Sequence, residues 1–271
     1  MGVEIDTADN KPLGNTGEKI PAIGLGTKGI QNYRWAEEAF LHAFNIGLRL
    51  IETSDQYGEG LAEEVIGRTI KKFKRDEIFI VLRIDSYRLS DIESAIKALS
   101  NSLKRMSVSY VDILLVDGPG DVVPIDLQMK VLEGVAQKGL TRYIGLSGFK
   151  VKDILKALEA LSKYSIVMIQ NKYSILDRRV EKDILKIAIE NKITIQACSP
   201  LEKGSVKHNP MIIHIASKYG KTPIQVALNY IISKPYVTAI PKSERKTHID
   251  EIAGTLGWRL SSEDIKFLEK F

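Results

Sequence analysis

The sequence has little cysteine and no long apolar run. Its 271 residues include one cysteine, Cys198, which excludes a disulfide framework and makes a reducing compartment the expected setting. No apolar stretch reaches the roughly 20 residues that a membrane-spanning helix needs. Residues 1–11 carry acidic side chains and lack an apolar centre, so they do not resemble a signal peptide. We therefore expect a cytoplasmic protein that does not act at a membrane.

Motifs for several common chemistries are also missing. The sequence contains no Walker A loop, no G-x-S-x-G, no H-E-x-x-H and no paired C-x-x-C, and its four histidines lack metal-ligand spacing. We therefore expect no metal site. The net charge of +5 is spread along the chain, and its densest basic run, KKFKR (71–75), has no interleaved aromatic residues. We interpret this run as a solvated helix end and expect no nucleic-acid partner.

Short apolar runs alternate with amphipathic segments along the whole chain. The composition is that of a globular protein, with 44% hydrophobic and 27% charged residues. The apolar runs predict strands, and they do not alternate with polar residues, which is typical of a parallel sheet buried on both faces. The predicted strands lie at 22–25, 49–53, 78–84, 110–116, 142–147, 166–170, 193–198 and 237–240. Predicted helices lie at 35–47, 61–73, 91–103, 127–139, 151–163, 180–192 and 222–234.

Eight such units without a linker predict one domain over residues 1–271, folded as a (β/α)8 TIM barrel. Asp91 and Pro223 indicate helix starts, and Gly139 indicates a helix end. Residues 12–21 predict an N-terminal β-hairpin, turning at 15–17, which we expect to close the base of the barrel. In this fold the active site lies at the carboxyl ends of the strands.

A dinucleotide-binding fingerprint offers an alternative fold. Gly24-x-Gly26-x-x-Gly29 follows a predicted strand, and Glu52 ends the next one, as in an open, doubly wound sheet. The following helix is predicted to begin near Trp35, too far from Gly29 for its N-terminus to hold a pyrophosphate. Eight uniform units also leave no separate substrate domain. These features favour the closed barrel.

Seven segments in order resemble the aldo-keto reductase family over nearly the full chain. None of them is decisive alone, but their order and spacing match throughout. They are PLGNTGEKIPAIGLGT (12–27), GLRLIETSDQYGEGLAEEVIGRTIK (47–71), VDILLVDGP (111–119), IGLSGF (144–149), QNKYSILDR (170–178), SPL (199–201) and AIPKS (239–243).

The resemblance implies an oxidoreductase that reduces a small-molecule carbonyl with hydride from NADP(H). The family uses Asp, Tyr, Lys and His for this reaction, and only the tyrosine, Tyr57, is retained here. Glu52, Arg83 and Asp117 stand at the other three positions. The resemblance implies Tyr57 as proton donor with Arg83 and Glu52 as its electrostatic support. We expect the charge of Arg83 to lower the pKa of Tyr57, and Glu52 to pair with the guanidinium.

Asp117 is the most consequential substitution. An ionised carboxylate cannot donate a hydrogen bond to a carbonyl oxygen, so Asp117 must either stay protonated beside Glu52 or pair with Arg83. One branch of the family carries Glu at this position and reduces a C=C bond, which leaves an activated C=C substrate open. The alternative is that Glu52, Arg83 and Asp117 form a charge-balanced cluster in a catalytically silent, nucleotide-binding barrel that acts as a sensor or scaffold.

The cofactor positions are partly retained. By resemblance, Ser147 and Gln170 hold the nicotinamide carboxamide, although Gly148 replaces the usual Asn between them. Cys198 stands where an aromatic ring usually stacks on the nicotinamide. Matching positions for the rest of the cofactor are Ser199 and Leu201 at the pyrophosphate, Lys242 and Ser243 at the 2′-phosphate, His248 in place of an Arg, and the retained Glu251. These residues imply NADP(H), with NAD(H) left open, and the family suggests a monomer or small homo-oligomer.

Overall fold

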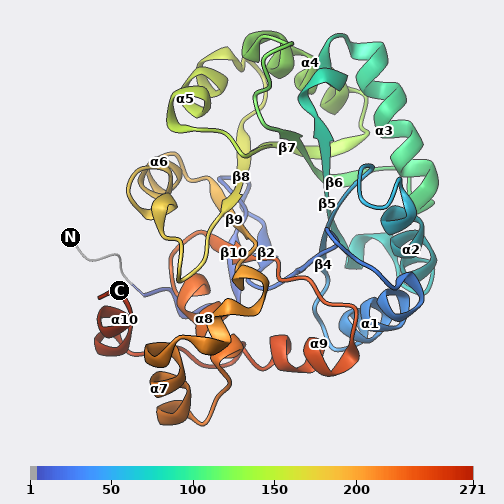
Figure 1. Ribbon diagram of the computed structural model, residues 1–271. Coiled ribbons are helices and arrows are strands. Elements are labelled where there is room, and N and C mark those ends of the chain that lie inside the picture. The colour runs from blue at the N-terminus through green and yellow to red at the C-terminus, as the bar shows by residue number, and fades with distance from the viewer. Residues whose placement is uncertain (1–4, 271) are drawn as a thin grey trace.

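Eight parallel strands form a barrel surrounded by helices (Figure 1) in the computed structural model, which describes residues 5–270. The strands are hydrogen-bonded in chain order from β3 to β10, and bridges between Ile23 and Ala239 and between Gly26 and Lys242 join the first strand to the last. The predicted (β/α)8 barrel is therefore confirmed. The strands are β3 (Leu25–Gly26), β4 (Leu50–Ser54), β5 (Phe79–Asp85), β6 (Val111–Asp117), β7 (Thr141–Ser147), β8 (Ile166–Lys172), β9 (Thr194–Cys198) and β10 (Val237–Ala239).

Seven of the helices, α1 to α6 and α8, correspond to the segments that the sequence pattern predicts. Asp91 caps the helix that begins at Ile92, its Oδ1 accepting from the Ser94 amide at 2.8 Å. Another helix begins at Pro223, and Gly139 follows the helix that ends at Gln137. The α-helices are α1 (Tyr33–Asn45), α2 (Leu61–Ile70), α3 (Ile92–Met106), α4 (Ile125–Gln137), α5 (Val151–Ala160), α6 (Ile184–Glu190), α7 (Pro210–Tyr219), α8 (Pro223–Ile232), α9 (Lys246–Ala253) and α10 (Ser262–Leu268). Short 3-10 helices are η1 (Arg75–Glu77), η2 (Ser86–Leu89), η3 (Arg179–Glu181) and η4 (Glu202–His208).

A hairpin of β1 (Asn10–Pro12) and β2 (Lys19–Pro21) precedes the barrel, as predicted. It is attached to Thr194, the first residue of β9, whose hydroxyl accepts from the Gly14 amide at 2.8 Å and donates to the Pro12 carbonyl at 2.7 Å. Leu13 and Ile20 of this segment are fully buried against the inside of the barrel. The hairpin therefore covers the amino-terminal end of the barrel and leaves the carboxyl ends of the strands uncovered.

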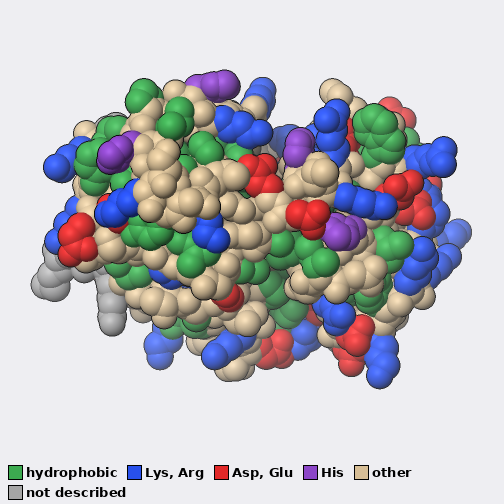
Figure 2. All heavy atoms as spheres, turned by 90° about the horizontal axis from the view of Figure 1, so that it is seen from below, with side chains coloured by type: hydrophobic (Ala, Val, Ile, Leu, Met, Phe, Trp, Pro, Cys, Tyr) green, Lys and Arg blue, Asp and Glu red, His purple; other side chains and the backbone are tan. Residues whose placement is uncertain are grey.

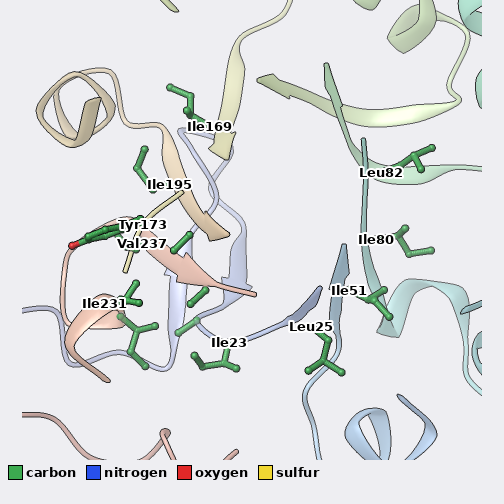
Figure 3. Close-up of a cluster of buried hydrophobic side chains, with 14 of the residues drawn as sticks. Ile23, Leu25, Ile51, Ile80, Leu82, Ile169, Tyr173, Ile195, Ile231 and Val237 are labelled. Atoms are coloured by element: carbon green, nitrogen blue, oxygen red, sulfur yellow. The ribbon is translucent and has the colours of Figure 1, made fainter. Parts of the chain in front are cut away.

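Alternate residues of each strand face opposite sides of the sheet. Ile51, Ile80 and Leu82 belong to the large apolar cluster between strands and helices (Figure 3). Their neighbours Leu50 and Val81 belong to a second cluster inside the barrel. Because side chains on a strand repeat with period two, this assignment fixes which face every later residue of the same strand presents.

The doubly wound alternative is wrong, and packing explains the glycines that suggested it. A Cβ on Gly24 would lie 2.7 Å from the Leu50 carbonyl oxygen and 2.4 Å from Leu50 Cγ. A Cβ on Gly26 would lie 3.0 Å from the Ile240 carbonyl oxygen. These two glycines therefore allow the first strand to approach its neighbours closely, and α1 begins only at Tyr33.

The surface is mixed in charge. Figure 2 shows acidic and basic side chains interspersed over the face that it displays. Within the basic run 71–75, Arg75 is partly buried and pairs with Asp112 at 2.7 Å, so this residue has a structural role. In the part of the chain that the structure describes, no helix is both long enough and apolar enough to cross a membrane. The first four residues of the segment compared with a signal peptide lie outside the described residues.

Candidate active site

Polar side chains end the inward-facing rows of five neighbouring strands. Leu50, Val81 and Leu115 face the inside of the barrel, and the residues two positions later on these strands must face the same way. The inside of the barrel is thus apolar near the hairpin and polar at the open end. The polar residues are Glu52 on β4, Arg83 on β5, Asp117 on β6, Ser147 on β7, and Gln170 on β8, followed on β9 by Gln196 and Cys198.

Tyr57 reaches this end from the loop after β4. Its amide donates to the Ser54 carbonyl at 3.1 Å, and its carbonyl accepts from the Ala62 amide at 3.3 Å at the start of α2. Gly58 and Gly60 in the same loop have φ of 59° and 91°, a left-handed backbone that glycine adopts without strain. The loop thereby turns back over the strand and buries Tyr57.

Arg83 lies at the centre of the cluster and is almost fully buried. Its Nη2 donates to the Tyr57 hydroxyl, and its Nη1 donates to Gln170 Oε1 at 2.9 Å. Its Nε lies 3.4 Å from an Asp117 oxygen and 3.9 Å from a Glu52 oxygen. The structure therefore brings together all four residues that the sequence proposed at the catalytic positions.

Tyr57 holds its proton more firmly than the sequence suggested. Burial raises its pKa, the Glu52 carboxyl raises it further, and the Arg83 guanidinium lowers it by less than the other two raise it. The expectation that the charge of Arg83 lowers this pKa is confirmed, but the net pKa is raised because burial and Glu52 outweigh it. Desolvation of a buried phenolate outweighs one nearby cation. Tyr57 is a neutral phenol at neutral pH, which is the protonation state that a proton donor needs.

The two carboxyl groups differ in their access to water. Glu52 is 2% exposed, and burial raises its pKa against the opposing effects of Arg83, Gln170 and Tyr57. The Asp117 side chain is 31% exposed. It accepts a hydrogen bond from Ser147 Oγ at 3.1 Å and pairs with Arg83. Of the two arrangements that the sequence leaves open for Asp117, the structure contains the pairing with Arg83.

Sequence reasoning missed Asp85 and Gln196. Asp85 is paired in register with Asp117 on the neighbouring strand, and burial raises its pKa, with Gln56 opposing as a hydrogen-bond donor. Gln196 is fully buried and accepts from Gln170 Nε2 at 2.8 Å. Asp85 directly follows the predicted strand 78–84, so the strand-end rule could have found it, whereas Gln196 lies within β9 and that rule does not point to it.

Ser147 and Gln170, the residues expected at the nicotinamide carboxamide, are hydrogen-bonded to one another. The Ser147 hydroxyl lies 3.1 Å from Asp117 Oδ1 and 3.2 Å from Gln170 Oε1. A bound carboxamide would therefore share or replace these contacts. Cys198 ends β9 beside them, and burial raises the pKa of its thiol to about 11.

The residues expected at the phosphates follow the carboxyl ends of β9 and β10. Ser199 has a φ of 52° directly after β9, and Leu201 precedes η4. Lys242 is exposed beside Gly26, to which it is bridged. Ser243 is buried, and its hydroxyl accepts from the Arg245 amide at 3.2 Å.

Helix α9 supplies the remaining cofactor candidates. His248 is exposed on this helix and Glu251 is partly exposed. Arg245, which sequence reasoning missed, precedes α9, with its guanidinium 5.7 Å from the centre of the Trp35 ring. The sequence feature that could have indicated Arg245 is its position three residues after Lys242. Exposed cations near the last two strands fit a phosphate-bearing cofactor, and hydroxyl and amide groups at the strand ends fit its carboxamide.

A cavity of about 400 Å³ lies beside the cluster, between the loops that follow β6 and β7. Gln128 on α4 supports the first of these loops, since its Nε2 donates to the Val123 carbonyl at 2.6 Å and also to the Pro119 carbonyl. The lining residues include Pro119 to Ile125, Gly148 and Lys150. Neither Tyr57 nor Arg83 lines it, so this cavity adjoins the cluster without containing its reactive groups.

Comparison with known proteins places this chain in a family. The model of the aldo/keto reductase family matches residues 22–271. A glyoxal reductase of Bacillus subtilis (strain 168) is 30% identical over 253 residues, covering 93% of this chain and 88% of that protein. The crystal structure of a thermostable aldo-keto reductase, Tm1743, in complex with the inhibitor epalrestat is 36% identical, with a TM-score of 0.89, and the match covers 96% of this chain and 98% of that one.

A further solved structure is of an aldo/keto reductase from Klebsiella pneumoniae in complex with NADP and acetate. It is 27% identical, with a TM-score of 0.90, and the match covers 97% of this chain and 94% of that one. Sequence and fold agree across these comparisons. The chain therefore belongs to the aldo/keto reductase family.

Proposed function

We propose that this protein reduces small-molecule carbonyl compounds with hydride from NADPH, and that Tyr57 donates the proton. The observation that carries the proposal is the hydrogen bond from Arg83 Nη2 to the Tyr57 hydroxyl at the open end of the barrel. Similar proteins include one named glyoxal reductase and one solved in complex with NADP, which supports the same chemistry here.

The reduction follows from the state of Tyr57. When bound, the reduced nicotinamide supplies the hydride that reaches the carbonyl carbon. Tyr57 gives its phenolic proton to the carbonyl oxygen as that oxygen gains negative charge. The phenolate left behind lies against the Arg83 guanidinium, and a charge-assisted hydrogen bond between them stabilises it. Arg83 thus offsets part of the effect of burial and Glu52, which both raise the pKa of Tyr57.

The cofactor would be held along the carboxyl ends of β7 to β10. Ser147 and Gln170 would bind the carboxamide, with Cys198 beside the ring. The loop of Ser199 and Leu201 would bind the pyrophosphate. At the far end Lys242 presents an exposed charge for a 2′-phosphate, which favours NADP(H) over NAD(H), with Ser243, His248 and Glu251 nearby in the sequence.

The test combines binding and turnover. NADPH and NADH are titrated separately into the protein while nicotinamide fluorescence is followed, and NADPH consumption is then measured with an aldehyde, a ketone and an enone. We expect wild type to turn over a carbonyl. Tyr57→Phe should bind NADPH like wild type but lose roughly a hundredfold or more in kcat. Tyr143→Phe is the matched control. It removes a tyrosine hydroxyl that donates to Glu18 at 2.8 Å near the hairpin, and it should keep the wild-type kcat.

The outcomes separate the alternatives. No binding at millimolar cofactor would overturn the proposal. Binding without turnover of any substrate would favour the silent barrel that acts as a sensor or scaffold. Turnover of the enone alone would favour reduction of an activated C=C bond. Equal affinity for NADPH and NADH would remove the proposed role of Lys242.

A further inference from the structure

Gln196 is a fully buried side chain on β9 that the proposed chemistry does not use. Its Oε1 accepts from Gln170 Nε2 at 2.8 Å. Its Nε2 has no hydrogen-bond partner among the described residues. Burying an unpaired amide N–H is unfavourable. The hydrogen bond that Gln196 Oε1 accepts therefore keeps the side chain in this orientation despite the unpaired Nε2.

The arrangement of donors explains why Gln196 lies in this orientation. Arg83 has only N–H donors, so the amide of Gln170 must turn its Oε1 toward Nη1, which it meets at 2.9 Å. Gln170 Nε2 then faces β9 and needs an acceptor. Gln196 supplies that acceptor with Oε1, and its own Nε2 is left unpaired as a result.

Gln170 in turn controls how Arg83 is oriented. Its contact with Nη1 is the shortest that Nη1 makes, since Ser147 Oγ lies 3.4 Å from the same nitrogen. The carboxylates of Asp117 and Glu52 lie 3.4 and 3.9 Å from Nε, which itself makes no hydrogen bond. If the Gln170 amide turned over, its Nε2 would face Nη1 as donor against donor. The guanidinium would then move away and loosen its contact with Tyr57.

We propose that Gln196 is a positioning residue for the reduction. By fixing the amide of Gln170, it holds Arg83 Nη2 against the Tyr57 hydroxyl and so sets how readily Tyr57 releases its proton. Glu52 also lies near the Gln170 amide, but Gln196 is the partner at hydrogen-bond distance. The inference rests on the proposed role of Tyr57 as proton donor.

Two substitutions of Gln196 distinguish the effect of its acceptor oxygen from the effect of its side-chain volume. Gln196→Met keeps the length of the side chain and removes the acceptor. Gln196→Glu keeps an acceptor oxygen in either protonation state. Thr194→Val is the matched control, because Thr194 is also fully buried on β9 and hydrogen-bonded, but lies at the hairpin end.

Steady-state kinetics give the first readout. We expect Gln196→Met to lower kcat about tenfold or more, with KM for the carbonyl substrate nearly unchanged, because a misplaced supporting group weakens proton transfer without removing binding contacts. Gln196→Glu should recover most of that loss, and Thr194→Val should keep the wild-type kcat. In a Tyr57→Phe background, Gln196→Met should cause no further loss. An equal loss in both backgrounds would show a merely structural role and overturn the proposal.

Crystal structures of wild type, Gln196→Met and Gln196→Glu give a readout that does not depend on activity. We expect the hydrogen bond between Arg83 and Tyr57 to be broken in Gln196→Met and kept in Gln196→Glu. An unchanged contact in Gln196→Met would overturn the proposal whatever the kinetics show. If wild type proves inactive while Arg83 moves in Gln196→Met, the role of Gln196 in placing Arg83 stands and the proposed function fails.

Discussion

Asp117 combines exposure with a buried partner. Its carboxylate pairs with Arg83 inside the barrel, while its side chain, 31% exposed, is the most accessible of the three charged groups around Tyr57. Its negative charge also raises the pKa of Tyr57. We therefore propose that a residue at this position acts on a substrate in two ways, through contact with the reacting oxygen and through the acidity of the phenol.

We expect Asp117→His to raise aldehyde reduction about tenfold. An imidazole can donate a hydrogen bond to the developing oxyanion, and one such donor is worth roughly 2.7–4 kcal/mol at best. The gain should be smaller because Arg83 loses one of its anionic partners and the neighbouring groups are coupled. Loss of the negative charge lowers the pKa of Tyr57, so the pH optimum should move to lower pH. Steady-state kinetics at several pH values measure both changes.

Two controls separate these effects. Asp117→Asn removes the charge without supplying an imidazole, so it should reproduce the pH shift but not the full gain in rate. Asp117→His combined with Tyr57→Phe should lose the gain. If Asp117→His binds NADPH but reduces aldehydes no faster than wild type, another part of the site limits the reaction. Loss of an enone activity that wild type possesses would instead identify Asp117 as a working acid.

Cys198 should react slowly with alkylating reagents. With a thiol pKa of about 11, only a small fraction is thiolate at pH 8, compared with a substantial fraction for an unperturbed cysteine near pKa 8.5. Iodoacetamide labelling at pH 8, followed by mass spectrometry, should be at least about tenfold slower than for the same protein in urea. The rate should rise about tenfold per pH unit between pH 8 and 10. Equal rates with and without urea would contradict the role of burial.

At the scale of single elements, α8 depends on a double hydrogen bond at its first turn. Thr222 Oγ1 accepts from the Gln225 amide at 3.2 Å, and Gln225 Oε1 accepts from the Thr222 amide at 3.0 Å. Gln225 Nε2 also donates to the Glu251 carbonyl at 3.0 Å, which connects α8 to α9. The start of α8 therefore also supports the helix that carries two of the cofactor candidates.

Thr222→Ala should lower the free energy of unfolding by about 1 kcal/mol, the usual loss for a removed N-cap. In a chain of this size that corresponds to a fall in Tm of roughly 2–4 °C. Thr222→Ser keeps the hydroxyl and should stay within a few tenths of a kcal/mol of wild type. Thermal unfolding followed by circular dichroism measures the difference. An Ala variant as stable as the Ser variant would show that Pro223 alone fixes the start of the helix.

Strand positions could be predicted because they depend on local pattern, and the resemblance to the family identified the members of the charged cluster. Apolar runs indicate the strands, and the side-chain period then places Glu52, Arg83 and Asp117 on one face. Hydrogen-bond partners could not be predicted in the same way. That Gln170 bonds to Gln196, or that burial outweighs Arg83 at Tyr57, depends on the packing of distant segments.

Helices α7, α9 and α10 were also missed. The expected pattern of one helix per strand has no place for α7, which lies with α8 between β9 and β10. Helices α9 and α10 follow the last strand, and the sequence pattern predicts no helix there. Counting repeats therefore finds the barrel but not the helices added around its last two units.

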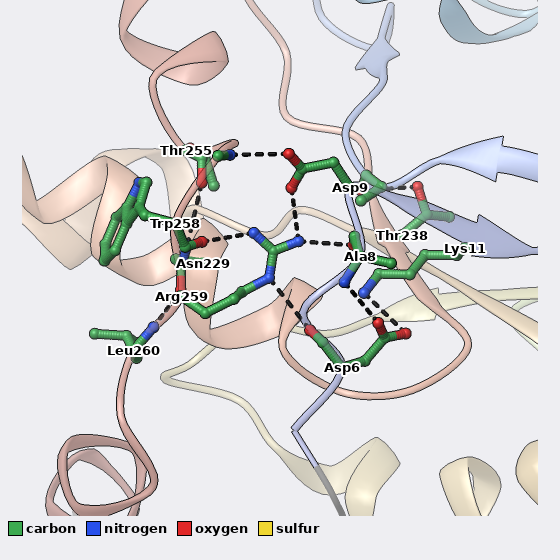
Figure 4. Close-up of polar contacts among 12 residues, drawn as sticks. Asp6, Ala8, Asp9, Lys11, Asn229, Thr238, Thr255, Trp258, Arg259 and Leu260 are labelled. Atoms are coloured by element: carbon green, nitrogen blue, oxygen red, sulfur yellow. Dashed lines mark hydrogen bonds and ion pairs between the residues drawn. The ribbon is translucent and has the colours of Figure 1, made fainter.

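Across the whole molecule, Arg259 joins the segment before the hairpin to the segment after α9 (Figure 4). Its guanidinium donates to the carbonyls of Asp6, Ala8 and Trp258 and to the Asp9 carboxylate, at 2.6–3.2 Å. Asp9 also accepts from the Gly257 amide at 2.9 Å. The Arg259 side chain is 6% exposed, so the guanidinium depends on these acceptors for its hydrogen bonds.

Arg259→Met should therefore lower the free energy of unfolding by about 2–3 kcal/mol, because it removes the hydrogen bonds that a buried guanidinium makes to three carbonyls and a carboxylate. The midpoint of urea denaturation measures the loss. Arg68→Met is the matched control, since Arg68 makes a half-exposed ion pair with Glu37 at 2.7 Å and its removal should cost less than about 1 kcal/mol. Similar midpoints for the two variants would contradict the difference expected from burial.

The seam between the first and last strands can form only after most of the chain has been synthesised. There Thr238 donates to the carbonyl of Ala22, 216 positions earlier in the chain, and the Gly24 amide donates to the Ala239 carbonyl. Contacts of such long range form slowly, and until they form, β3 and β9 expose unpaired strand edges that favour aggregation. Lys242 directly follows this seam. A chain still emerging from the ribosome therefore contains Glu52, Arg83 and Asp117 before it contains Lys242, the residue that we propose binds a phosphate.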